Sequence, residues 1–205
     1  MKRLFDIIAS GCGLLFLSPL LLCVAIWIKL DSKGPVFFRQ VRVGRYNKDF
    51  RIFKFRSMRI DAEKNGPKWA DQNDDRCTRL GKFLRKCRLD ELPQLLNILR
   101  GDMSIVGPRP ERKVIADEYC KDIPEFAYRL KVRGGLTGYA QIYGKYNTSA
   151  YDKIRLDLMY IENYSLMLDI KLIILTLRII FSKESTEGID KQQENQRKIA
   201  ELLGE

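Results

Sequence analysis

The sequence predicts a mainly α-helical protein with a small β element, attached to a membrane by its N-terminal segment. Residues 7–28 form a stretch without a charged side chain. Several later segments carry apolar residues at helical spacing, and residues 37–55 have the pattern of two short strands joined by a turn. The length of 205 residues suits one domain of ordinary size.

The uncharged stretch is the strongest single signal. A helix over these residues would be about 33 Å long, enough to reach across the hydrocarbon core of a bilayer. Pro19, which follows Ser18, predicts a kink halfway along it. Basic residues flank both ends, which favours both ends on the cytoplasmic side, as in a re-entrant hairpin. A single span that tolerates the proline remains the alternative, and both place the rest of the chain at the cytoplasmic face.

The amino-acid composition limits the partners and the catalytic groups that the protein can use. Lys and Arg number 37 against 26 Asp and Glu, and the formal charge of +11 predicts an anionic partner such as nucleic acid, anionic lipid or a phosphorylated substrate. The absence of histidine excludes histidine acid/base catalysis and His-ligated zinc. Five cysteines without a CxxC pair argue against a disulfide framework or a zinc ribbon and favour a reducing, cytoplasmic setting.

Most of the excess charge follows the membrane segment. Residues 29–60 contain ten basic residues against two aspartates, and the turn at 44–47 separates the two expected strands. Lys54 and Arg56 share a strand face because side chains alternate with period two. This face suits anionic headgroups, whereas for most of the other bases a solvated strand edge protected by charge is the simpler interpretation.

The remainder reads as helices and loops. Thr78 is expected to cap a basic amphipathic helix whose apolar positions are Leu80, Phe83, Leu84 and Cys87. A second helix should begin near Asp90 and stop at Gly101. Glycines at 134, 135, 138 and 144 predict a loop-rich stretch. Further helices are expected over residues 111–121, 150–163 and 166–181, the last lying in the membrane interface or packed on the core.

Asp90 and Glu91 are the first candidates for chemistry. Pro93 is tolerated only in the first turn of a helix, so Asp90 is the expected cap and both carboxylates should lie at a helix N-terminus, which keeps them ionised. Neighbouring helical residues diverge by about 100°, so one acid can attack or accept a proton while the other binds a cation. An ordinary acidic cap is the alternative.

The segment Gly107-Pro108-Arg109-Pro110 is the second candidate. Two prolines restrict the backbone around one arginine and lower the entropic cost of holding its guanidinium for phosphate oxygens. For such a segment taken alone, a rigid turn with a surface arginine is the commoner outcome. Together, the membrane segment, the acid pair, the arginine and the basic surface suit phosphate chemistry on a lipid substrate.

These residues resemble the bacterial sugar transferase family, the monotopic phosphoglycosyl transferases. The resemblance runs from about residue 2 to 181, and its motifs are Lys2-Arg3 with Asp6, Ser18-Pro19, residues 54–58, Arg85, residues 89–95, 101–104 and 107–110, residues 135–138 with Gln141, and residues 167–169. It implies a re-entrant membrane helix over 1–33 and a compact catalytic domain over 34–182 with interfacial helices. The composition of residues 183–205 predicts a charged tail. Longer relatives add N-terminal spanning helices, so the chain resembles the minimal catalytic form.

The resemblance also implies an activity. Members move a sugar 1-phosphate from a UDP-sugar to polyprenyl (undecaprenyl) phosphate and release UMP, at the cytoplasmic face of the bacterial inner membrane, as the first membrane step of capsule, exopolysaccharide or lipopolysaccharide assembly. Asp90 would be the nucleophile that becomes a phosphosugar-aspartate, and Glu91 would hold Mg²⁺. Phosphate or nucleotide would be bound by Arg85, Arg109, Lys54, Arg56, Gln141 and Lys145.

Two departures accompany it. Lys145 follows Gly144 where many relatives have an arginine, which replaces a two-pronged donor by a point charge and leaves its phosphate role open. Arg133-Gly134-Gly135 stands where relatives often have Arg-Pro-Gly, which predicts a looser loop.

Other functions remain open on the sequence. With the same substrates, one direct displacement would need Asp90 only to align the metal. A basic peripheral membrane protein or nucleic-acid binder is the non-enzymatic alternative, supported by aromatics among the bases of residues 29–60. The resemblance implies UDP-sugar, polyprenyl phosphate and membrane lipids as partners rather than nucleic acid, and leaves a homo-oligomer open.

Overall fold

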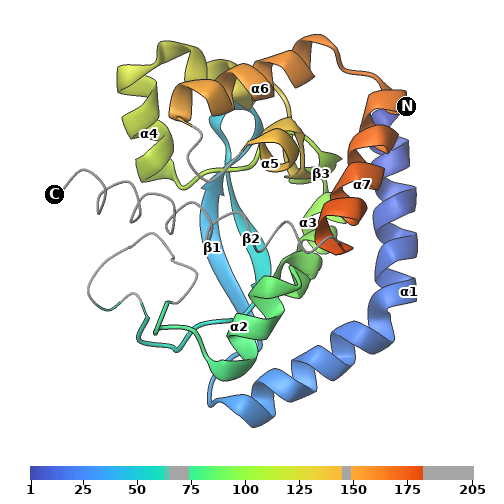
Figure 1. The fold of residues 1–205 in the computed structure, drawn as a ribbon, viewed down its shortest axis with the longest axis vertical. Helices are drawn as coiled ribbons and strands as arrows, with labels where there is room; N and C mark the ends of the chain where they lie inside the picture. Colours follow the sequence, from blue (N-terminus) through green and yellow to red (C-terminus); the bar gives the residue numbers. More distant parts are fainter. Residues whose placement is uncertain (63, 65–73, 145–148, 182–205) are drawn as a thin grey trace, which may run out of the picture.

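The computed structural model describes residues 1–62, 64, 74–144 and 149–181, and this part is mainly helical with two small two-stranded sheets (Figure 1). The expected fold class is therefore confirmed. The elements in chain order are α1 (Lys2–Asp31), β1 (Phe37–Val43), η1 (Arg45–Asn47), β2 (Asp49–Phe55), α2 (Arg79–Lys86), η2 (Leu89–Gln94), α3 (Leu95–Arg100), β3 (Met103–Val106), α4 (Lys113–Asp122), η3 (Pro124–Lys131), β4 (Gly134–Thr137), α5 (Tyr139–Tyr143), α6 (Ala150–Glu162) and α7 (Leu166–Phe181).

Helix α1 contains the uncharged stretch and bends in its middle, as Figure 1 shows. Pro19 lies inside the helix and cannot donate a backbone hydrogen bond to the carbonyl of Leu15. The hydroxyl of Ser18 donates to that carbonyl at 2.8 Å instead. Ser18 thus satisfies the acceptor that the proline frees, which is how a kinked helix remains tolerable in an apolar environment.

The concave side of the bent helix α1 faces the rest of the protein (Figure 1). Val24 and Ile28 of its second half pack with Phe55, Leu80 and Leu84. The first half contributes Leu14 and Leu17 to the cluster around Ile98 and Met103. Other apolar side chains of α1 are exposed, Phe16 at 85% and Leu30 at 80%. Among the described residues, α1 is the one helix long and apolar enough to cross a membrane.

The expected hairpin is confirmed. Strands β1 and β2 pair antiparallel, with Phe37 opposite Phe55 and Val43 opposite Asp49. The turn at residues 44–47 is a short 3₁₀ segment in which Tyr46 and Asn47 have positive φ angles. Ile52 and Phe55 are both buried, on opposite faces of β2, and they belong to two different apolar clusters.

The second sheet was not expected. Residues 134–137, predicted as part of a loop, form β4, which pairs parallel with β3. A Cβ on Gly135 would lie 2.1 Å from the amide nitrogen of Gly107, so only glycine allows this close backbone approach. The prediction of a looser loop at Arg133-Gly134-Gly135 is therefore wrong, because both glycines are buried in a strand.

The remaining helices agree with the sequence pattern. Thr78 caps α2 by accepting from the amide of Gly81 at 2.9 Å, and Gly101 ends α3 with a φ of 99°. Helices α4, α6 and α7 cover the expected ranges within a few residues. Figure 1 shows α7 beside the first half of α1, where Lys2 contacts Asp169. The expected tail over 183–205 lies outside the described residues.

Candidate active site

The acid pair lies in a tight turn rather than at an α-helix cap. Residues Leu89–Gln94 form the 3₁₀ helix η2, its N-cap is Arg88 in the left-handed region, and α3 begins only at Leu95. The expectation that Asp90 caps the helix is therefore wrong. Pro93 has no N–H for an α-helical bond to Leu89, so the chain takes the tighter 3₁₀ turn first. Asp90 and Glu91 are both 9% exposed.

Glu91 is the centre of a compact charge cluster. Its Oε1 accepts from Lys54 Nζ at 2.7 Å and from Arg109 Nη2 at 2.6 Å. Arg109 Nη1 approaches Oε2 at 3.3 Å, so the arginine grips the carboxylate with both prongs. These residues come from β2, η2 and the segment after β3, which the fold brings to one place. We call Lys54, Asp90, Glu91 and Arg109 the carboxylate cluster.

The two neighbouring acids have opposite electrostatic environments. Burial, followed by the charge of Glu91, raises the pKa of Asp90 to about 6 against the lowering effect of Lys54. Burial would also raise the pKa of Glu91, but the charges and hydrogen bonds of Arg109 and Lys54 outweigh it and hold that pKa well below its ordinary value. Glu91 is thus a fixed anion, and Asp90 can exchange a proton near neutral pH.

Arg85 belongs to the surroundings of Asp90. Its positive charge is among those that lower the pKa of Asp90, after that of Lys54. Its Nη1 also lies 3.0 Å from the Sγ of Cys77. The predicted grouping of Arg85, Lys54 and Arg109 around the acid pair therefore agrees with the arrangement of their charges.

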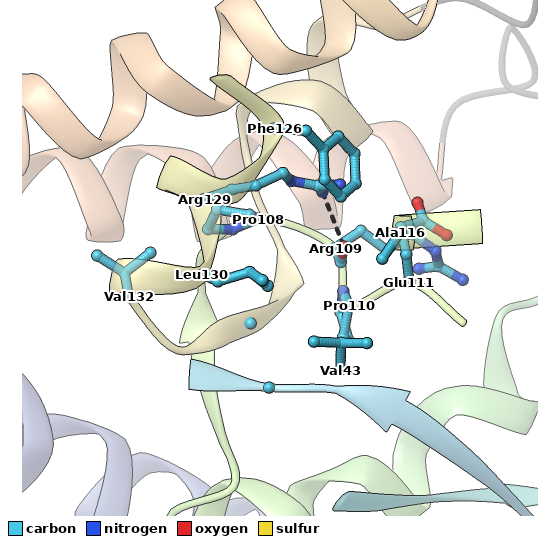
Figure 2. Close-up of a pocket in the computed structure, with 12 residues that line it drawn as sticks. Val43, Pro108, Arg109, Pro110, Glu111, Ala116, Phe126, Arg129, Leu130 and Val132 are labelled. Carbon is cyan, nitrogen blue, oxygen red and sulfur yellow. Dashed lines mark hydrogen bonds between the residues drawn. The ribbon is translucent and has the colours of Figure 1, made fainter. Parts of the chain in front are cut away.

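The Arg109 segment is held from several sides. Gly107 donates its N–H to Thr137 O at 2.8 Å, and Gly135 donates to Pro108 O at 2.8 Å, which ties the segment to β4. Arg42 Nη1 donates to Pro110 O at 3.1 Å. Figure 2 shows this segment passing between the end of β1 and η3. The proline-flanked arginine is therefore fixed in space as its sequence suggested.

One predicted site residue, Arg56, makes its contacts away from the carboxylate cluster. Arg56 follows the end of β2, is 6% exposed, and donates to the carbonyls of Ser32 and Lys33 at the end of α1. It does not share the environment of Lys54. Gln141 lies in α5, where both polar atoms of its buried amide have no hydrogen-bond partner among the described residues. Lys145 lies outside the described residues.

Sequence reasoning missed two polar contacts that bear on the site. Lys2 Nζ lies 2.6 Å from Asp169 Oδ2 and 3.1 Å from the Tyr160 hydroxyl, which joins the start of α1 to α6 and α7. Arg129 contacts Asp157 and the backbone of Arg109. Asp157 had a detectable signal, because it lies between Ile154 and Tyr160 on the apolar face of α6, where an acid needs a buried partner.

The acid pair fits a divalent cation only together with a substrate. Within the described residues, no group of three acidic, cysteine or histidine side chains could hold a metal ion alone. Mg²⁺ commonly binds one or two carboxylates and completes its shell with substrate phosphates and water. Asp90 and Glu91 satisfy that pattern, provided that Lys54 and Arg109 shift part of their contact from Glu91 to the phosphates.

The cluster lies beside the candidate membrane helix. Leu89, directly before the acids, packs against the cluster that contains Val24 and Ile28 of α1. Leu95, at the other end of η2, lies 3.4 Å from the position of a Cβ built on Gly13. The acid pair is thus bracketed by two contacts with α1, one on each side of the bend at Pro19.

The chain is similar to known proteins over most of its length. The chain matches the family model described as bacterial sugar transferase over residues 1–183. It is 47% identical over 185 residues to an Aeromonas hydrophila protein named UDP-N-acetylgalactosamine-undecaprenyl-phosphate N-acetylgalactosaminephosphotransferase, covering 89% of this chain and 44% of that protein. It is 43% identical over 182 residues to the UDP-glucose:undecaprenyl-phosphate glucose-1-phosphate transferase of Escherichia coli K12, covering 86% and 39%.

A third relative is closer in length. The exopolysaccharide production protein PSS of Rhizobium leguminosarum is 43% identical over 182 residues, covering 84% of this chain and 91% of that protein. The chain spans about two fifths of the length of the first two relatives. Because the family model covers most of the residues, including the carboxylate cluster and α1, the chain belongs to the bacterial sugar transferase family.

Proposed function

We propose that the protein transfers a sugar 1-phosphate from a UDP-sugar to undecaprenyl phosphate and releases UMP. The family and the names of the relatives supply the reaction class. The observation that carries the proposal for this chain is the acid pair, ringed by Lys54, Arg85 and Arg109 and bracketed by two contacts with α1. A phosphorylated sugar and a lipid phosphate can meet at such a place.

The proposed reaction has two displacements at one phosphorus atom. In the first, an Oδ atom of ionised Asp90 attacks the phosphorus that carries the sugar, the bond from that phosphorus to the bridging oxygen breaks, and UMP leaves with the electron pair. In the second, a phosphate oxygen of undecaprenyl phosphate attacks the same phosphorus and the Asp90 carboxylate leaves. The protein is regenerated, and one phosphoanhydride bond replaces another.

Asp90 is suited to the nucleophile role, and Glu91 is not. Glu91 is bound by two cations, which lowers the reactivity of its oxygens. Within the described residues, the side chain of Asp90 has no hydrogen bond, and its pKa of about 6 leaves it mostly ionised at neutral pH. A weakly stabilised carboxylate beside strong cations is a better nucleophile than a fully paired one.

The surrounding cations act on the diphosphate. Arg109 and Lys54 approach one side of Glu91 and would share their donors with substrate phosphates, which neutralises charge that develops on the leaving UMP. Arg85 adds positive charge near Asp90. We assign Glu91 as the residue that would hold Mg²⁺, which when bound supplies further charge neutralisation at the diphosphate.

The membrane arrangement belongs to the same proposal. We place α1 as a re-entrant helix, with both ends at the cytoplasmic face of the inner membrane, because its bend and its basic flanks suit a hairpin. An N-terminal epitope tag should then be digested by protease in inverted vesicles and protected in intact spheroplasts. Digestion of that tag in intact spheroplasts would instead establish a span.

The basic stretch after α1 is largely used within the molecule. Arg39 lies over the ring of Phe53, and Arg45 donates to the carbonyl of Lys131. Arg42 lies 3.8 Å from Glu111, while Lys54 and Arg56 make the contacts described above. These contacts give the bases structural partners, so no particular observation favours a nucleic-acid-binding function.

The test is a panel of UDP-sugars incubated with the purified protein, Mg²⁺ and undecaprenyl phosphate. We expect UMP release from at least one of them, with a lipid-linked sugar diphosphate as the second product. Intact-mass measurement without the lipid should show one phosphosugar added to the wild-type chain and none to Asp90→Asn. Lipid product without any adduct would favour direct displacement, and salt-dependent DNA binding without UMP release would refute the proposal.

A further inference from the structure

A buried ion pair lies directly behind the Arg109 segment. Arg129 of η3 and Asp157 of α6 approach to 2.8 Å between Nη2 and Oδ2, and their side chains are 7% and 1% exposed. The same Nη2 donates to the backbone carbonyl of Arg109 at 2.8 Å, the dashed line of Figure 2. One guanidinium nitrogen therefore links α6 to the peptide group that follows Arg109.

Two prolines do not by themselves fix Arg109. A proline locks its own φ angle, and Pro110 confines Arg109 to the extended region without setting the exact ψ angle. That ψ angle orients the Arg109 carbonyl relative to its side chain. A donor held at the Arg109 carbonyl from outside the segment acts on this ψ angle directly, and Arg129 is that donor.

Packing behind the segment is incomplete. Figure 2 shows a hollow between the segment, the end of β1 and η3, lined among others by Val43, Phe126 and Leu130. The guanidinium of Arg129 borders it, with its central carbon 4.5 Å from the centre of the Phe126 ring. The hollow leaves fewer packing contacts on this side of the segment, so the hydrogen bond from Arg129 is a specific restraint there.

A contribution to stability alone does not explain the buried pair of Arg129 and Asp157. Burial, partly countered by Arg129, raises the pKa of Asp157 to about 6, which shows that the charged acid is costly where it lies. Buried pairs of this kind often contribute little net stability compared with apolar replacements. What they do supply is a fixed direction for the remaining donors of the arginine.

We propose that Arg129, oriented by Asp157, is a positioning residue for Arg109. By holding the Arg109 carbonyl, it directs the Arg109 side chain toward Glu91 and, during the reaction, toward the diphosphate. The inference rests on the proposed function, in which Arg109 binds substrate phosphate. Neither Arg129 nor Asp157 touches the substrate in this scheme.

A double-mutant cycle tests the proposal with the full chain in detergent or nanodiscs. Arg129→Lys preserves the charge opposite Asp157 but shortens the side chain and removes the planar guanidinium whose Nη2 contacts both acceptors. We expect it to lower kcat/KM for the UDP-sugar by about 10 to 100-fold, chiefly through KM. In an Arg109→Lys background the same change should cost less than about twofold, because its effect passes through Arg109.

Arg45→Lys is the matched control. Arg45 also donates to a carbonyl of η3, that of Lys131 at 3.0 Å, but it does not contact the Arg109 segment. Its kcat/KM should stay within about twofold of wild type. Where Arg129→Lys fails to fold, Asp157→Asn is the replacement and should show the same dependence on Arg109.

The outcomes separate the two proposals. An equal loss of kcat/KM in the wild-type and Arg109→Lys backgrounds would mean that Arg129 acts on the fold in general and would overturn the positioning role. An unchanged kcat/KM in Arg129→Lys would overturn it as well. If neither wild type nor Arg45→Lys releases UMP from any UDP-sugar, the proposed function fails first and the positioning role fails with it.

Discussion

Two buried polar groups in this protein use similar residues in different ways. In the first, which we call the anchor triad, Lys2, Tyr160 and Asp169 join α1 to α6 and α7. Asp169 is a single acid whose two oxygens are both paired, Oδ2 with Lys2 at 2.6 Å and Oδ1 with the Tyr160 hydroxyl at 2.7 Å. In the carboxylate cluster, two acids are adjacent and Glu91 takes the direct contacts of both cations.

The difference lies in what is left unpaired. Burial and the hydrogen bond with Asp169 raise the pKa of the Tyr160 hydroxyl, so it remains a donor and the anchor triad is electrostatically closed. The carboxylate cluster leaves Asp90 buried beside a permanent anion, with a raised pKa. The fully paired anchor triad holds secondary-structure elements together. The carboxylate cluster, in which Asp90 has no hydrogen-bond partner among the described residues, retains a reactive carboxylate at the expense of stability.

Asp90→Asn should give the largest effect and sharpen this contrast. We expect UMP release to fall by at least about 10³-fold, because the amide cannot attack phosphorus. Stability should rise at pH 7–8. The folded state raises the pKa of Asp90 from 3.8 to about 6, so its contribution favours folding below pH 3.8 and is lost as the pH rises through about 6.

Both quantities come from one preparation of the variant, by UMP assay and by denaturant unfolding in detergent. A loss of activity accompanied by a comparable loss of stability would mean that Asp90 is structural, as Asp169 of the anchor triad is. Retained turnover would remove Asp90 from the mechanism altogether.

The pH dependence of kcat/KM should show that Asp90 is the acid that titrates during the reaction. Because Asp90 must be ionised to attack, kcat/KM is expected to fall about tenfold per pH unit below about pH 6. Lys54→Met should move this acidic limb to higher pH, because the charge of Lys54 lowers the pKa of Asp90. Lys113→Met is the control, since Lys113 is half exposed and faces Asp49 instead. Identical limbs in wild type and Lys54→Met would break the assignment.

Asp169→Asn should show the opposite behaviour to Asp90→Asn. Removing the charge leaves Lys2 without its counter-ion at a site where the acid is 1% exposed, and we expect a loss of about 1–3 kcal/mol in the free energy of unfolding. Activity per folded molecule should change little. Thermal unfolding compared with Asp117→Asn, an exposed acid of α4, provides the measurement. A stability equal to that of the control would show that the triad does not hold α1 in place.

Much of the fold was predictable because local signals are strong in this chain. Thr78 and Gly101 mark helix ends by capping chemistry, and the turn at 44–47 separates two strands of alternating pattern. The kink followed from Pro19. The parallel pair β3–β4 was missed because its glycine strand is four residues long and exists only through a partner 31 residues away.

Most residues of the site could be predicted from the sequence, but the contacts between them could not. Asp90, Glu91 and Arg109 stood out by their neighbours in sequence, and Lys54 by its strand position. Arg56 shows the limit, since the end of β2 at Phe55 lets it turn back to cap α1 rather than join Lys54. Arg129 carried no local signal, because its importance depends on a carbonyl twenty residues away.

The sequence by itself determined that this protein has a bent apolar helix, an adjacent acid pair and a proline-flanked arginine, because each depends on neighbouring residues and short-range backbone sterics. Only the tertiary structure decided that Glu91 takes both cations while Asp90 keeps a raised pKa. Burial and charge pairing arise from segments distant along the chain, and free energies of that kind are fixed by distance in space rather than by order in sequence.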